Sequence, residues 1–301
     1  MRQGEVTTTA ARRVLERRAR EVLKRRHAVR RRGRPDDIHD LRVATRRLQE
    51  AIDLLAFVLP ERERARARRR ARRIRRGFAE VRDADVLLET LVALAGRCAP
   101  PDRRALLALR PRLQARVGRA RVAVARRGGA PPGAARLGAG PAEEVAGLPV
   151  PGVRRRLTAL LRTLPPVPMP ALGRVAARLL AGRSAAVGRG LERARSGRAA
   201  DLHRLRIAVK EYRYTLELMH EIGLGRYARA IDAARRIQER LGRLHDVDVL
   251  LALLRRGGGT WRGRGTRPAI PAVLRRERSA LVASALATAA RFRPVTGGVL
   301  P

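Results

Sequence analysis

The sequence predicts an all-α protein made of two pseudo-twofold-related helical bundles, with about four helices each, that arose by internal duplication. Residues 38–55 separate into an apolar and a basic stripe when they are drawn on an α-helix. The same pattern returns in residues 202–219, and residues 244–251 repeat 81–88. Hydrophobic residues make up 45% of the chain but aromatic residues only 2%, which suits closely packed helices better than a β-sandwich.

The first half, residues 5–127, is predicted to hold four helices. Residues 6–32 form a basic amphipathic pattern that ends at Gly33-Arg34-Pro35. The next helix carries the first basic stripe, has Asp36 or Asp37 as a possible N-cap, and ends near Pro60. These two helices have the length and patterning of bundle helices.

The third helix of this half begins at Glu61 and is crowded with arginines. An apolar seam through Ala67, Ala71 and Ile74 continues to Asp85, so packing should fix the segment despite the repulsion between like charges. A fourth helix covers about residues 102–127, and Pro111 should kink or break it.

Residues 128–170 are rich in glycine and proline and are predicted to be a linker that contains one short helix. The second bundle then spans residues 171–292 and repeats the order of the first. Its last two helices are joined by a loop rich in glycine and arginine that contains Trp261.

Each basic stripe combines an imidazole with cations one and two turns further along the helix. In the first copy these residues are His39, Arg42 and Arg46, and in the second they are His203, Arg206 and Lys210. Arginine presents a planar pair of donors that matches phosphate oxygens, and a neighbouring histidine can donate to the same group. The stripes therefore predict a surface for phosphate-bearing anions, while a histidine satisfied within the core stays the alternative at each position.

These motifs resemble the CHAD family (conserved histidine α-helical domain) over about residues 5–292. The resemblance rests on two helices that begin with an apolar residue, His and x-x-Arg, each followed some forty residues later by an Asp-x-Asp segment. It implies two helical bundles related by pseudo-twofold symmetry, a strongly basic concave surface, and binding of inorganic polyphosphate. No cofactor is implied.

The expected contacts to polyphosphate come from both stripes and from arginines on the neighbouring helices. They are His39, Arg42, Arg46, Arg47, Arg69, Arg73, Arg76, Arg82, His203, Arg206, Lys210, Arg213, Arg236 and His245. The second copy departs from the first, with Lys210 in place of Arg46, Glu211 in place of Arg47, and His245 in place of Arg82, so it is expected to bind less strongly.

Two acids, Asp85 and Asp248, fall on apolar stripes and are expected to be structural. A buried carboxylate needs a partner, and the basic residues of adjacent helices are available. We therefore expect both acids to orient arginine or histidine side chains, and Asp83 and Asp246 to do the same nearer the surface.

A formal net charge of +42 and a pI near 12 call for a polyanionic partner. A GC-rich genome could explain arginine in place of lysine, but it does not obviously explain the shortage of acids. Nucleic acid, RNA or DNA, is the alternative polyanion, although single-strand binders usually line their grooves with several aromatic residues. A ribosomal or granule protein held by charge alone would lack the repeated histidine stripes.

Enzymatic activity, a metal site and a membrane span are not expected. The sequence contains no Walker loop and no HExxH motif, and Cys98 is its only cysteine. His245-Asp246 is superficially like a metal phosphohydrolase pair, but Arg82 occupies the matching position of His245 in the first copy. The N-terminus has no apolar signal core, so we expect a cytoplasmic protein, with attachment to polyphosphate granules and the oligomeric state left open.

Overall fold

A computed structural model describes residues 3–57, 59–127, 169–256 and 269–296, and these are all helical or connecting segments without a β-strand. The all-α prediction is confirmed. The predicted linker at 128–170, apart from its last two residues, and the loop with Trp261 lie outside the described residues. No described helix is both long enough and apolar enough to cross a membrane.

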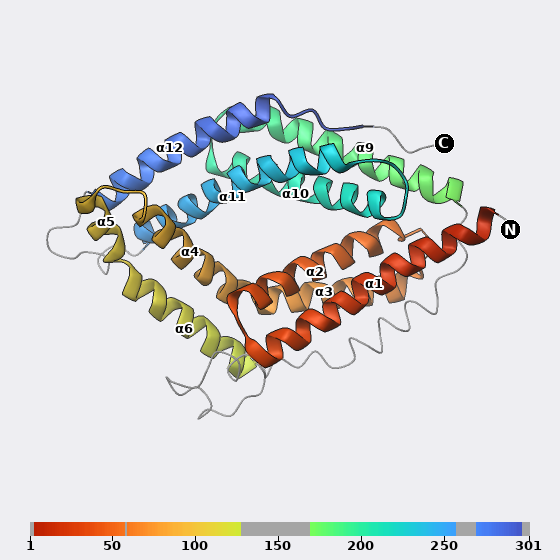
Figure 1. Cartoon of the computed structure of the whole chain (residues 1–301), viewed down its shortest axis with the longest axis horizontal. Helices are drawn as coiled ribbons and strands as arrows, with labels where there is room; N and C mark the ends of the chain where they lie inside the picture. Colours follow the sequence, from red (N-terminus) through yellow and green to blue (C-terminus); the bar gives the residue numbers. More distant parts are fainter. Residues whose placement is uncertain (1–2, 58, 128–168, 257–268, 297–301) are drawn as a thin grey trace.

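The first half places α1 (Gln3–Arg32), α2 (Pro35–Leu54) and α3 (Glu61–Gly77) on one side of the molecule and α4 (Ala79–Ala95), α5 (Pro100–Leu107) and α6 (Arg110–Arg127) at its end (Figure 1). The second half lies along the opposite side as α9 (Met169–Ala194), α10 (Ala199–Glu221), α11 (Ala228–Arg256) and α12 (Ala269–Ala290).

Matching glycines end the first helix of each half. Gly33 and Gly197, 164 positions apart, have φ angles of 57° and 64°. Their amide N–H groups donate to the carbonyls of Val29 and Ala194, both at 2.9 Å. A left-handed residue at this position is usually glycine because a Cβ atom would be strained there. Both halves therefore place a left-handed glycine between their first and second helices.

The third predicted helix is broken in the first half and continuous in the second. Phe78, with φ −105° and ψ 11°, separates α3 from α4, whereas α11 runs through the corresponding region without interruption. Phe78 is 4% exposed, so burial of its ring accompanies the break. The expected break near Pro111 is also present, since α5 ends at Leu107 and α6 begins at Arg110.

The two halves share their hydrophobic cores. One core joins α1, α2 and α3 to α9, α10 and α11, with Leu41, Ile52, Leu205 and Tyr212 each at most 1% exposed. The second core joins α4, α5 and α6 to α11 and α12. Packing across the duplication therefore fixes how the second helices of the two copies, α2 and α10, face each other.

Candidate functional site

A cleft of about 520 Å³ opens between α2 and α4 of the first half and α10 and α11 of the second. Both basic stripes contribute to it. Eight of the basic residues predicted from the sequence line this one cleft: His39, Arg42, Arg46, Arg82, Arg206, Lys210, Arg213 and His245.

The apolar stripes explain why these cations converge. On α2, Ile38 and Leu41 are fully buried and Leu48 is 3% exposed, which turns the adjacent stripe toward the second half. On α10, Leu205 and Val209 do the same for Arg206 and Lys210. Burial of one stripe therefore directs the other into the cleft.

Lys210 lies among four guanidinium groups within the cleft. Burial is the main cause that lowers its pKa to about 6, and the charges of Arg46, Arg206, Arg42 and Arg213 lower it further. Within the described part of the chain, Lys210 has no hydrogen bond or ion pair. Lys210 itself therefore lacks a negatively charged partner.

Two histidines of the second half form a pair beside Lys210. Nδ1 of His203 lies 3.2 Å from Nδ1 of His245, and the ring centroids are 4.6 Å apart. Burial, followed by the charge of Arg206, lowers the pKa of His245 to about 4. When both rings are neutral, the accepting ring carries its proton on Nε2. His245 lines the cleft, whereas His203 is not among its lining residues and holds His245 from outside.

Tyr214 lines the cleft close to guanidinium groups from both halves. The Cζ atoms of Arg213 and Arg46 lie 4.7 Å and 5.8 Å from the centroid of its ring. A ring in this position attracts both cations and offsets part of their mutual repulsion. Sequence reasoning missed this role, although an aromatic residue next to Arg213 on a helix with few other aromatics was an available signal.

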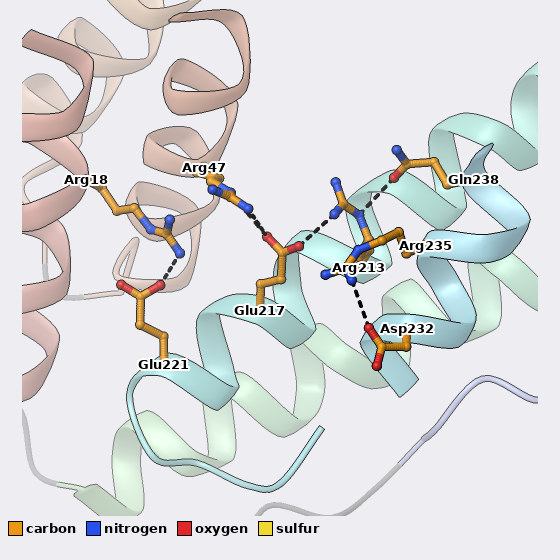
Figure 2. A network of polar contacts seen from close by, with 8 residues as sticks. All are labelled: Arg18, Arg47, Arg213, Glu217, Glu221, Asp232, Arg235 and Gln238. Atoms are coloured by element: carbon orange, nitrogen blue, oxygen red, sulfur yellow. Dashed lines mark hydrogen bonds and ion pairs between the residues drawn. The ribbon is translucent and has the colours of Figure 1, made fainter. Parts of the chain in front are cut away.

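A chain of polar contacts holds Arg213 in the cleft (Figure 2). Its Nε donates to Gln238 at 2.9 Å and its Nη1 donates to Glu217 at 2.7 Å. The second oxygen of Glu217 accepts from Arg47 at 3.0 Å, which joins α10 to α2. Arg47 thus pairs with an acid of the other half and is not among the residues that line the cleft.

A second pairing of the same kind lies nearby, where Arg17 and Arg18 of α1 both contact Glu221 of α10. Figure 2 places Arg18 and Glu221 beside the contact between Arg47 and Glu217. The two halves are therefore tied together on this side by ion pairs.

The other predicted contact residues lie outside the cleft. Arg69, Arg73 and Arg76 are exposed on α3, and Arg236 is exposed on α11. One arginine of α3 does connect to the site, because Arg42 donates to the backbone carbonyl of Arg75 at 3.0 Å.

The two Asp-x-Asp segments place their acids in two environments. Asp85 is 5% exposed and lies 3.5 Å from Arg121, while Asp248 accepts from Arg278 at 2.6 Å. The first acids of the two segments, Asp83 and Asp246, line the cleft. Burial raises the pKa of Asp246 to about 6, an effect that Arg206 and Arg82 oppose. Acids that line the cleft itself were not predicted, and the charges of Arg42 and Arg206 act on Asp83 and Asp246, respectively.

Among the residues that the structure describes, no group of three or more histidine, cysteine, aspartate or glutamate side chains is arranged to hold a metal ion. The absence of a metal site stays a prediction.

A sequence model of the CHAD domain matches residues 13–255 of this chain. Among solved structures, the CHAD domain from the plant Ricinus communis is 22% identical, with a TM-score of 0.67, and the match covers 96% of this chain and 93% of that one. PptA from Streptomyces chartreusis is 16% identical, with a TM-score of 0.58, and the match covers 95% and 96%. At these identities the two structures show the shared fold alone. No curated protein matched the chain.

Proposed function

The chain belongs to the CHAD domain family, and from this premise we propose that it binds inorganic polyphosphate in the cleft between its two halves. The observation that carries the proposal is the cluster around Lys210, in which an ammonium or amine is surrounded by Arg42, Arg46, Arg206 and Arg213. Gathering that many cations is unfavourable unless an anion is present. A phosphate-bearing ligand supplies the missing charge and accepts bidentate hydrogen bonds from the guanidinium groups.

The shape of the cleft favours a chain of phosphates over a single one. From residue 39 to residue 46 the stripe on α2 rises about 10 Å, and the stripe on α10 is of similar length. Cations from both halves line the same space, so a polymer can contact both stripes at once. Long chains gain from this arrangement because the second stripe is engaged without a further loss of translational freedom.

Binding without catalysis is part of the proposal. Arg213, Arg46 and Tyr214 are held by contacts within the protein, which suits a preformed site for an anion. The acids Asp83 and Asp246 lie among arginines, and their part in the proposal is to orient those side chains.

Nucleic acid is the competing ligand, and the aromatic content of the cleft disfavours it. Tyr214 is the one aromatic ring, histidines aside, among the described lining residues. It is 3% exposed, and the guanidinium groups of Arg46 and Arg213 lie close to its ring. Stacking on bases needs an open aromatic face. The cleft therefore offers charge and hydrogen bonds but little means of contacting bases.

A competition titration tests the proposal. Long-chain polyphosphate, single-stranded RNA and duplex DNA of matched total charge are titrated against the full chain at several salt concentrations. We expect polyphosphate to bind most tightly at physiological salt. Equal or tighter binding of either nucleic acid would refute the preference for polyphosphate.

A further inference from the structure

Lysine is nearly absent from this chain. Lys24 and Lys210 are its two lysines among 69 lysine and arginine residues. Lys24 is exposed on α1, whereas Lys210 lines the cleft, at the position that Arg46 occupies in the first copy. Lys210 is thus one of two side-chain amines in the chain, and it lies among the arginines of the cleft.

An amine differs from a guanidinium group because it can lose its proton near neutral pH. Arginine stays charged in proteins, so the four neighbours of Lys210 remain cationic. Lys210 has no acid within hydrogen-bonding distance to retain its proton among the described residues, and its pKa lies at about 6. At pH 7.5 the free cleft therefore holds a neutral amine, which is the nucleophilic form of lysine.

We propose that Lys210 is a covalent modification site for small acyl phosphates. The inference rests on the proposed ability of the cleft to bind phosphate, because Arg46 and Arg206 would hold the phosphate group of the donor beside the amine. The lysine nitrogen attacks the carbonyl carbon and forms an amide bond. The bond from that carbon to the phosphate oxygen breaks, inorganic phosphate leaves with the electron pair, and the proton of the amine passes to phosphate or water.

The surrounding arginines favour this step in two ways. They keep the amine neutral, and their guanidinium groups stabilise the negative charge that develops on the departing phosphate. The product is an uncharged amide that adds bulk within the cleft. Acylation and polyphosphate binding should therefore exclude each other, since both need the space around Lys210.

The chain supplies its own control for the test, because Lys24 is the one other lysine. The full chain is incubated with acetyl phosphate at pH 7.5, digested with a protease that cleaves at acidic residues, and analysed by mass spectrometry. An ordinary lysine with a pKa of about 10.4 is about 0.1% neutral at this pH, while Lys210 is almost fully neutral. A less basic amine is also a weaker nucleophile, which offsets part of this difference in the neutral fraction. We therefore expect acetylation of Lys210 to be at least about tenfold faster than that of Lys24. Equal rates at the two lysines would overturn the inference.

Two further arms separate the role of phosphate from simple reactivity. Saturating polyphosphate should slow acetylation at Lys210 and leave Lys24 unchanged. An acetylating reagent without phosphate, such as N-acetoxysuccinimide, should prefer Lys210 much less strongly. An equal preference with both reagents would show that the phosphate group is not held, and would refute the assignment to acyl phosphates.

Direct titration with polyphosphate on the same preparation separates this inference from the proposed function. If polyphosphate binds and Lys210 is no more reactive than Lys24, the modification site is refuted and the binding function stands. If Lys210 reacts selectively and polyphosphate fails to bind, the modification site stands and the polymer-binding function is refuted.

Discussion

Replacing Lys210 by methionine should make the protein more stable and a weaker binder at the same time. Methionine has a similar length, fills the same space and carries no charge. The fall in pKa from 10.5 to about 6 is about 4.5 units, which corresponds to about 6 kcal/mol of unfavourable free energy for the charged amine in the folded protein. Replacing buried charges by apolar residues typically stabilises by about 1–4 kcal/mol, so we expect a gain in that range at pH 7.

The pH dependence of this gain identifies its cause. The folded-state pKa of Lys210 lies below the unfolded value, so between pH 6 and pH 10.5 the unfolded chain holds a proton that the folded chain has lost. The wild-type free energy of unfolding should therefore rise with pH across this window, with a slope of up to about 1.4 kcal/mol per pH unit from this group. The variant lacks this contribution, and the gap between the two proteins should narrow as pH increases.

Chemical denaturation between pH 7 and pH 9.5 measures the effect. His245 and Asp246, which also face the cleft, titrate below this range, with pKa values of about 4 and about 6. Arg42, Arg46, Arg206 and Arg213 keep their charge throughout. A variant that is less stable than the wild type, or a gap that does not change with pH, would refute the view that Lys210 is a buried, deprotonated amine.

The second part of this prediction concerns the affinity of the Lys210→Met variant for polyphosphate. Polyphosphate brings many negative charges into the cleft, where an acyl phosphate brings at most two, and should restore the proton to Lys210. Calorimetric titrations at pH 7.5 in buffers of different ionisation enthalpy should therefore detect proton uptake. The Lys210→Met variant should take up about one proton fewer and bind more weakly. Lys210→Arg is the matched control, because it keeps the positive charge but has no proton to gain. Unchanged affinity in Lys210→Met would mean that the residue is not part of the binding site.

Three further perturbations test separate parts of the site. Arg42→Glu and Arg206→Glu should each weaken the binding of long polyphosphate much more than that of short chains, because short chains do not bridge both stripes. The control Arg236→Glu, at an exposed residue outside the cleft, should weaken the binding of all lengths slightly. If titration with sized polymers shows losses that do not depend on length, the two stripes are independent sites. Asp85→Ala should lower the free energy of unfolding by about 3–5 kcal/mol, because Arg121 is left buried without its acidic partner. Asp248→Ala should lower it by less, because Arg278 is more exposed and also donates to the carbonyl of Gly197. Unchanged thermal melting together with lost polyphosphate binding would show that these acids are functional. Tyr214→Leu should weaken polyphosphate binding by removing the ring between Arg46 and Arg213, with an expected cost of about 1–2 kcal/mol in affinity, and unchanged affinity would show that the ring does not position these cations.

Local patterns were enough to predict the helices, and the arrangement of the two halves is compatible with the predicted duplication. The apolar residues Ile38, Leu41 and Leu48 are spaced with the period of an α-helix. Helix geometry then sets the direction in which the neighbouring basic stripe points relative to them. The break at Phe78 was not predicted, because the seam from Ala67 to Asp85 keeps its periodicity through that residue. Helical periodicity shows which residues share a face, but it does not show whether the backbone continues.

The sequence by itself determined which side chains lie on each helix face, and therefore the two stripes of His39, Arg42 and Arg46 and of His203, Arg206 and Lys210. Only the tertiary structure decided what those side chains meet. Arg47 is paired with Glu217, 170 positions away, and His203 lies against His245 behind the cleft wall. The first pairing depends on how α10 packs across α2, and the second depends on how α10 packs against α11. That packing is set by cores whose apolar residues are interchangeable in sequence. The faces follow from local geometry, whereas the partners follow from packing between distant helices.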